Sequence, residues 1–284
     1  MKWLSDAREF TVPFGNKELR AWAWGDGGSR TALLVHGWAG RGSQLGSLAA
    51  PLVAQGFRVV AFDGPGHGRS SGRRSSLPEM AGAVAAMLRN LRGADAVIAH
   101  SLGATATAAA LAGYPGLDSD LDVGALAFVA PPSEVHGLIR RFSQMTGLSM
   151  PVLQEMRRRI EKRFGIEWHE LQVSQLAPRI ARPVWVAHCV DDREIPIEQG
   201  RELAAVWPGA SLHETAGLGH RRILRDRSTI RHLVGYVARY GTRSNQSGKA
   251  SPTGSLHDSG ATRKVLGSPG RSATFDAAVA GYDA

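Results

Sequence analysis

Short apolar runs alternate along the chain with segments of helical periodicity. The apolar runs at 32–36, 59–63, 96–99 and 184–190 predict strands, and further strands are expected after Val123 and at 210–215. The segments at 44–55, 76–91 and 102–111 predict helices. Ser76 and Glu79 have the spacing of a capping box at the start of the second helix. An opening hairpin is expected at 8–14 and 19–24. This alternation predicts an α/β fold, with a mostly parallel central sheet and helices on both faces.

The alternation is interrupted between residues 130 and 180. Two prolines begin this interval, and two helical patterns follow, at 134–145 and 151–164. We expect a short helical cap at about 131–180, within a domain of residues 1–240. From residue 241 the composition changes to Ser, Gly, Ala and Thr with little periodicity, which predicts a disordered tail over 241–284.

A serine occupies the junction between one predicted strand and the helix that follows it. Ser101 lies after the run 96–99 and before the alanine-rich segment 102–111. A strand-to-helix elbow forces its central residue into sparsely populated backbone space, so its neighbours two positions away must be small. Ala99 and Gly103 satisfy that requirement. The motif predicts a nucleophile, although an ordinary strand-to-helix turn has a similar pattern.

A serine nucleophile requires a histidine base and an acid that orients it, and both residue types follow predicted strands downstream. Asp191 and Asp192 come directly after the run 184–190. His220 is expected on the loop after the segment 210–215, just before a helix predicted from Arg221. Since the carboxyl ends of parallel strands meet at one edge of a sheet, the serine, an acid and the histidine are expected to converge there. Strand order leaves both aspartates open as the acid, with Glu134 as a remote third choice.

At this point the chain resembles the α/β-hydrolase superfamily, and within it the serine esterases and monoglyceride-lipase-like hydrolases with a small lid. The resemblance covers about residues 8–240. The segments that carry it are His36-Gly37-Trp38, Asp63 to Ser70, the elbow at Ser101, Asp192 to Pro196, and Gly219-His220. The chain departs from the commonest pattern at Ala99, where the family has glycine.

The resemblance implies roles for particular residues. Asp192 stands at the acid position of the family's Asp-x-x-Val/Ile-Pro motif and is preferred to Asp191. His220 is expected to take the proton of Ser101 as its oxygen attacks an acyl carbon, while Asp192 orients the imidazole. The resemblance assigns the oxyanion-hole donors to the backbone N–H groups of Trp38 and Leu102. An acyl-enzyme, later hydrolysed by water, follows from this chemistry.

The cap and the loops around the nucleophile supply the candidate substrate-binding residues. These candidates are Gly37, His100, Phe142, Met145 and Met150. Packing against the body of the protein is the alternative role for the apolar ones, because apolar residues at helical spacing normally form core. A cap of about fifty residues implies, by the resemblance, small to medium acyl chains.

These observations predict a serine-dependent hydrolase of carboxylic esters. A thioesterase, a lactonase, an amidase or a carbon-carbon bond hydrolase would use the same three residues, so these activities stay open. A dehalogenase is disfavoured, because Ser101 stands where that chemistry needs a carboxylate. The alternative from another class is a hydrolase-like ligand receptor without catalysis.

Charge, cysteine content and loop motifs argue against several other classes. The chain has a formal net charge of +9, but acids are interleaved with the basic clusters at 157–163 and 221–225, so no nucleic-acid partner is expected. Cys189 is the single cysteine, and no Cys/His spacing predicts a metal site. No glycine-rich loop has the pattern that holds a nucleotide, and no cofactor is expected.

The apolar runs also bear on location. The N-terminal residues lack the continuous apolar stretch of a signal peptide, and no run approaches the roughly 20 residues that cross a bilayer. We therefore expect a cytoplasmic protein that does not insert into membranes and acts on a small-molecule ester. The sequence gives no prediction of oligomeric state.

Overall fold

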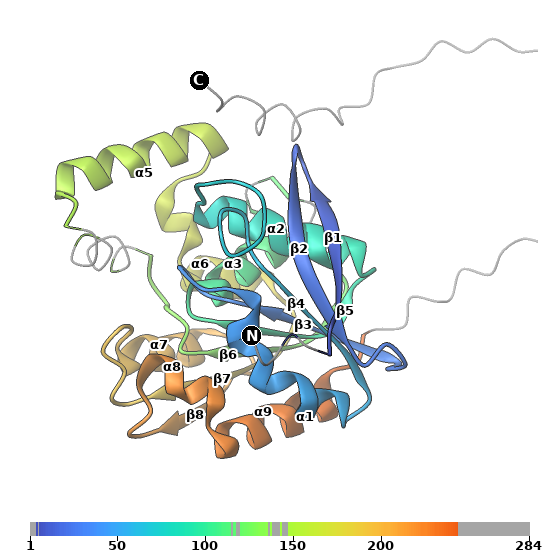
Figure 1. Ribbon diagram of the computed structural model, residues 1–284. Helices are drawn as coiled ribbons and strands as arrows, with labels where there is room; N and C mark the ends of the chain where they lie inside the picture. Colours follow the sequence, from blue (N-terminus) through green and yellow to red (C-terminus); the bar gives the residue numbers. More distant parts are fainter. Residues whose placement is uncertain are drawn as a thin grey trace, which may run out of the picture.

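A computed structural model describes residues 4, 6–114, 116–117, 120–135, 137, 143 and 147–243 (Figure 1). One eight-stranded sheet forms its centre, in the order β1-β2-β4-β3-β5-β6-β7-β8. The strands are β1 Arg8–Phe14, β2 Lys17–Trp24, β3 Arg30–Val35, β4 Phe57–Phe62, β5 Ala94–His100, β6 Val123–Val129, β7 Val184–Cys189 and β8 Ser211–Thr215. β1 and β2 pair antiparallel, as do β2 and β4, and all later pairs are parallel. The predicted fold class is confirmed.

Helices cover both faces of this sheet (Figure 1). They include α1 Ala49–Val53, α2 Leu77–Asn90, α3 Leu102–Leu111, α7 Ile197–Val206 and α9 Arg227–Tyr240. Leu33 and Val35 of β3 pack with α2 and α3, whereas Ala32 and Leu34 pack with α1 and α9. Successive strand side chains point to opposite faces, so one apolar strand contributes to two separate cores.

Two predicted helices are divided in the structure. Residues expected to form one helix at 44–55 form a 3₁₀ helix, η1 Gly42–Leu48, followed by α1. Pro51 lacks the N–H that a continuous α-helix would use there, so the α-helical part begins anew at Ala49.

The predicted helix from Arg221 is likewise the short α8 Gly219–Arg222, the 3₁₀ helix η4 Ile223–Arg225 and then α9. Asp226 caps α9 by accepting the Thr229 N–H at 2.7 Å. Because α8 begins at Gly219, His220 lies in the first turn of a helix and not on the loop where the sequence placed it.

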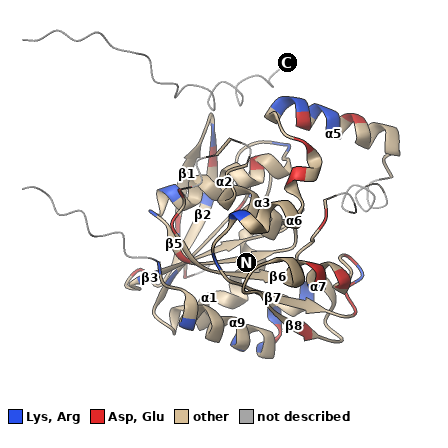
Figure 2. Ribbon diagram, turned by 180° about the vertical axis from the view of Figure 1, so that it is seen from behind, with Lys and Arg blue, Asp and Glu red and all other residues tan. Residues whose placement is uncertain are grey.

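The cap interval contains α5 Met150–Phe164, close to the predicted helix at 151–164, followed by η2 Trp168–Leu171, α6 Val173–Leu176 and η3 Ala177–Arg179. Most of the predicted helix at 134–145 lies outside the described residues, together with the candidates Phe142 and Met145. Met150 begins α5 and is 41% exposed. Figure 2 shows basic residues, coloured blue, along α5, where Arg158 and Arg159 both pair with Glu155.

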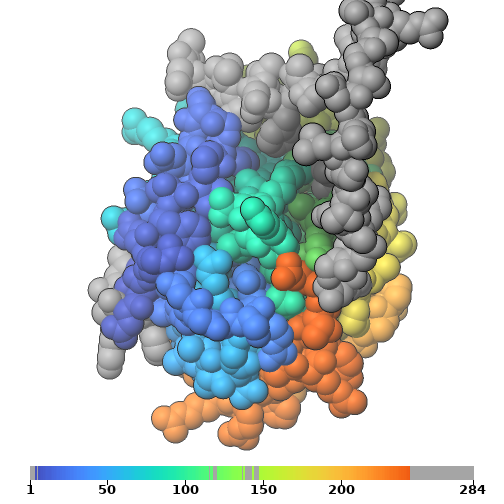
Figure 3. Space-filling model, turned by 90° about the vertical axis from the view of Figure 1, so that its right-hand side faces the viewer, coloured from blue at the N-terminus to red at the C-terminus, as the bar shows by residue number. Residues whose placement is uncertain are grey.

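Segments far apart in the sequence adjoin on the α1/α9 face. The Ser47 hydroxyl of η1 donates to the carbonyl of Leu224 in η4 at 2.6 Å. Figure 3 shows the corresponding blue and orange surfaces side by side. This contact ties the turn after β3 to the segment that follows His220.

The described part of the chain ends shortly after α9. Arg243 still contacts the body, because its side chain pairs with Asp95 at 3.3 Å and donates to the carbonyl of Arg92 at 2.6 Å. The predicted tail from 244 onward lies outside the described residues. Among the helices that the structure describes, none combines the length and apolar character needed to cross a bilayer.

Candidate active site

Ser101 occupies the turn between β5 and α3 with a backbone conformation that side-chain-bearing residues seldom adopt, at φ 52° and ψ −130°. Such a conformation costs about 1 to 3 kcal/mol and persists only where the surroundings impose it. The Ser101 N–H donates to the carbonyl of Val129 in β6 at 2.9 Å, so sheet pairing continues into the turn. The turn is therefore the sharp elbow that the sequence predicted.

Glycines allow the elbow to pack closely against the end of β3. A Cβ built on Gly103 would lie 2.5 Å from the His36 carbonyl oxygen, and one built on Gly37 would lie 2.8 Å from the Ser101 Cβ. Both distances are far below van der Waals contact. Gly37 consequently brings its loop directly against the serine, and Gly103 lets α3 start beside β3.

Asp192 and His220 are joined by a short hydrogen bond. The His220 Nδ1–H donates to Asp192 Oδ2 at 2.7 Å, and both side chains are buried. The other carboxylate oxygen of Asp192 accepts the N–H groups of Glu194 and Ile195 at 2.8 and 2.9 Å. Asp192, and not Asp191, is thus the acid paired with the histidine ring, whereas Glu134 is exposed after β6.

The environment of Asp192 favours its charged form. Burial alone would raise the pKa, but hydrogen bonds from His188 and His220, the charge of His220 and the Ile195 N–H outweigh it. Together they hold the pKa of Asp192 well below its ordinary value. At neutral pH the carboxylate is ionised and can stabilise a positive charge on the neighbouring imidazole.

His100 links the serine turn to the histidine. It precedes Ser101, and its Nε2–H donates to the backbone carbonyl of His220 at 3.0 Å, with the two imidazole centroids 4.7 Å apart. Burial, and to a lesser degree the charge of His220, lower the pKa of His100 to about 3. His100 is therefore neutral, and its ring packs against the imidazole of His220. Among the described residues, no hydrogen bond joins the Ser101 hydroxyl to His220.

The loop after β3 is fixed by a buried histidine. His36 Nδ1–H donates to the Gly37 carbonyl at 2.7 Å, and its Nε2 accepts the Gly64 N–H at 2.8 Å. Burial lowers the pKa of His36 to about 4, which keeps the ring neutral. Because a trans peptide points its C=O and N–H in opposite directions, holding the Gly37 carbonyl turns the Trp38 N–H away from His36.

His188 is a site residue that the sequence analysis missed. It is the penultimate residue of β7 and is fully buried. Its Nε2 donates to the Ile195 carbonyl at 2.9 Å and lies 3.5 Å from Asp192 Oδ2. Its Nδ1 is buried without a hydrogen-bond partner and faces Gly200 of α7. A histidine four residues before the acid, inside an apolar run, was the available signal.

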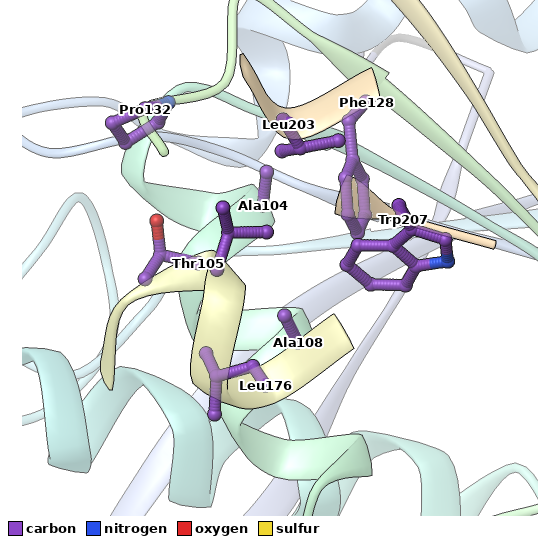
Figure 4. A pocket seen from close by; sticks show the side chains of 9 residues that line it. Ala104, Thr105, Ala108, Phe128, Pro132, Leu176, Leu203 and Trp207 are labelled. Atoms are coloured by element: carbon purple, nitrogen blue, oxygen red, sulfur yellow. The ribbon is translucent and has the colours of Figure 1, made fainter. Parts of the chain in front are cut away.

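A small apolar cavity lies along α3 (Figure 4). Its lining comes from α3, β6, α6 and α7, and includes Ala104, Thr105, Phe128 and Trp207. The Thr105 hydroxyl is buried without a hydrogen-bond partner. With a volume of about 10 Å³ the cavity holds at most about one water molecule and is too small for an acyl chain.

The fold and this arrangement of residues define an α/β hydrolase. Residues 32–230 match the alpha/beta hydrolase family, and the chain belongs to that family. A 67-residue stretch is 43% identical to a "Serine hydrolase-like protein" of Danio rerio, covering 24% of this chain. The match spans only 20% of that relative's length.

Solved structures share the fold at low sequence identity. An esterase of Pyrococcus furiosus is 18% identical, with a TM-score of 0.63 over 85% of this chain and 96% of its own. An esterase from Exiguobacterium antarcticum is 15% identical, with a TM-score of 0.64 over 81% of this chain and 99% of its own. A bromoperoxidase from Bacillus anthracis is 14% identical, with a TM-score of 0.65 over 82% and 100%. Esterases are thus among the proteins that share this fold, and membership of the family supports a hydrolase activity.

Proposed function

We propose that this protein is a serine-dependent hydrolase of carboxylic esters, with Ser101 as nucleophile, His220 as base and Asp192 as the acid that orients the base. The observation that carries the proposal is the 2.7 Å bond between His220 and Asp192, with the His220 carbonyl bound by His100, the residue that precedes Ser101. A strained serine beside a paired histidine and carboxylate is the arrangement that activates a hydroxyl for attack.

Each proton has a donor and an acceptor in this mechanism. Because Nδ1 of His220 is bonded to Asp192, Nε2 is the nitrogen left to receive the Ser101 proton. The serine oxygen attacks the acyl carbon, and the imidazolium returns the proton to the leaving alcohol. Water then attacks the acyl-enzyme by the reverse proton path and releases the acid. The ionised Asp192 stabilises the imidazolium in both halves of the reaction.

The negative oxygen of the tetrahedral intermediate needs donors already in place. Leu102 is the first residue of α3, and N–H groups in the first turn of a helix have no partner within the helix. Trp38 offers the second N–H, on the side of its peptide that faces away from His36. Losing one such donor costs roughly 3 to 4 kcal/mol of barrier in a comparable site.

The substrate is a small-molecule ester with a small to medium acyl chain. Gly37 would contact it, because that glycine already lies against Ser101, and Met150 remains a candidate from the cap. His100 is better placed to support His220 than to touch substrate, since its ring is buried and bonded to the His220 carbonyl. The reaction as proposed requires no cofactor.

The test is hydrolysis of p-nitrophenyl esters from acetate to palmitate, with Ser101→Ala protein purified in parallel. We expect turnover that depends on Ser101 and peaks at short to medium chains. Labelling of the native protein, but not of the variant, by a fluorophosphonate probe would identify the activated serine independently of the ester chosen.

Two other outcomes would redirect the proposal. Labelling without ester turnover would favour a thioester, lactone, amide or carbon-carbon substrate on the same residues. If the native protein neither reacts with the probe nor exceeds the variant on any ester, the hydrolase proposal is wrong and a ligand-binding role takes its place.

A further inference from the structure

The segment that carries His220 has little intrinsic order of its own. Gly217, Leu218 and Gly219 connect β8 to α8, and both glycines have positive φ values, 74° and 63°. Glycine adopts many backbone conformations at similar energy, so this sequence does not select the one observed. Something outside the segment must fix it if His220 is to stay in register with Asp192.

Side chains from the end of β7 bind the N–H groups of this segment. Asp191 Oδ2 accepts the Gly217 N–H at 2.5 Å. The Cys189 sulfur accepts the N–H groups of Leu218 and Gly219 at 3.3 and 3.0 Å. Three consecutive backbone donors are therefore held by two residues that flank Val190 at the end of β7.

The carbonyl groups of the same segment are bound from the other side. Arg222, in α8, donates through its guanidinium to the carbonyls of Gly217 and Leu218 at 2.8 and 3.0 Å. The carbonyl of His220 itself accepts from His100. The backbone leading to His220 is thus hydrogen-bonded on both sides by side chains.

We propose that Cys189, Asp191 and Arg222 form a clamp that positions His220 for the reaction described above. The inference rests on the proposed function for its catalytic consequence. The two adjacent aspartates have different partners. Asp192 binds the imidazole of His220, and Asp191 binds the backbone N–H of Gly217, in the segment that leads to His220. All three clamp members are positioning residues, since their contacts are with the backbone and not with the reacting atoms.

The clamp matters because proton transfer is sensitive to small displacements. A misplacement of about 1 Å can cost about a hundredfold in rate. Without the clamp, two glycines would allow His220 to sample positions away from Asp192 and Ser101. Substrate binding would be little changed, so the loss belongs in kcat and not in KM.

Asp191→Ala and Arg222→Ala change exposed residues and are expected to fold. Cys189→Ala removes the buried acceptor. Asp191→Asn and Cys189→Ser keep an acceptor atom at each position and serve as conservative rescues. Asp26→Ala is the matched control, because it removes an exposed carboxylate that pairs with Arg8 on the β1 side of the sheet.

The first readout is kinetics on p-nitrophenyl acetate. We expect the three alanine variants to lower kcat by about tenfold to a hundredfold, with KM within about twofold of native. Asp191→Asn, Cys189→Ser and Asp26→Ala should remain within about threefold of native. The second readout is the ¹⁵N-histidine NMR spectrum, in which the His220 signal is identified by its loss in His220→Gln. It should report a Nδ1-protonated ring in the native protein and a mixture of tautomers in the alanine variants.

The two readouts separate the clamp from the esterase proposal. Unchanged tautomer and kcat in Asp191→Ala and Arg222→Ala would overturn the clamp, whatever Cys189→Ala does to folding. Altered His220 tautomers in a protein without Ser101-dependent turnover would support the clamp and contradict the esterase function. Equal losses in the alanine and conservative variants would also overturn the clamp, because hydrogen bonding would not be the cause.

Discussion

The serine and the histidine are held in place by different means. Ser101 lies between β5 and α3, two regular elements whose backbone hydrogen bonds and close glycine contacts impose its conformation. His220 follows a glycine-containing segment whose backbone is bonded by side chains from β7, α8 and β5. The first arrangement relies on the backbone of regular elements packed against one another, and the second on individual side chains that bind a loop.

This difference has consequences for mutation. Because β5 and α3 pack tightly on either side of Ser101, we expect most single substitutions near it to leave its backbone conformation unchanged. Substitutions that introduce a steric clash are the exception. The segment before His220 depends on individual acceptors and donors, each of which a single substitution removes. We therefore expect His220, the proposed base, to be more easily displaced by mutation than Ser101.

The largest expected effect tests whether Ser101 and His220 act together in one catalytic step. Ser101→Ala and His220→Ala should each lower kcat for ester hydrolysis by roughly 10⁴-fold or more, and the double variant should be scarcely worse. Steady-state kinetics on the best p-nitrophenyl ester measures this. Losses that multiply in the double variant would mean that the two residues do not share a step.

The next prediction concerns His36 and His100, the buried neutral histidines near Ser101 and His220. The pKa values of His36 and His100 are lowered to about 4 and about 3 in the folded protein. The unfolded chain therefore binds more protons below about pH 6.5, and stability falls as the pH drops. Between pH 7 and pH 5 the expected loss is about 2 kcal/mol for each histidine.

Urea unfolding at these two pH values measures that loss. Replacing His100 by Gln should reduce the difference in unfolding free energy by about 2 kcal/mol, because the proton that His100 takes up on unfolding is removed. An unchanged difference would show that His100 takes up its proton without unfolding, and would contradict its neutral, buried state.

The packing of the elbow predicts a smaller effect. Gly103→Ala places a Cβ 2.5 Å from the His36 carbonyl oxygen, which should destabilise the fold by about 2 kcal/mol. Gly235→Ala in α9 is the matched control, since nothing lies within 4 Å of the added Cβ and alanine favours the helix by up to about 1 kcal/mol. Urea midpoints that move in opposite directions would support the elbow geometry, and a neutral Gly103→Ala would contradict it.

The smallest expected effect concerns the residues after α9, away from Ser101 and His220. Ending the chain after Tyr240 removes the contacts of Arg243 with Asp95 and Arg92, and should cost no more than about 1 kcal/mol. Ester turnover should be unchanged in that protein and in one that ends after Arg243. A melting curve and a turnover assay check this, and lost turnover in the longer form would assign residues 244–284 a role in the site.

The elbow was predictable because its determinants are local. The apolar run of β5, the alanine-rich α3 and the small residues flanking Ser101 are adjacent in sequence. The strand β1 likewise has the predicted bounds, since the hydrophobic alternation of a hairpin strand identifies it directly. By contrast, the predicted helix at 44–55 is divided in the structure. Pro51 was the signal for this division, but the prediction followed the apolar pattern instead.

The sequence by itself predicted the fold class, the elbow, and a serine, an aspartate and a histidine that each follow a separate strand, because parallel strands bring their carboxyl ends to one edge. Only the tertiary structure decided which aspartate meets the imidazole, that His188 supports it, and that Cys189 and Arg222 bind the backbone before His220. Those outcomes depend on which atoms of distant loops come within about 3 Å of one another. No local propensity specifies such distances, since they arise when the sheet and its helices pack together.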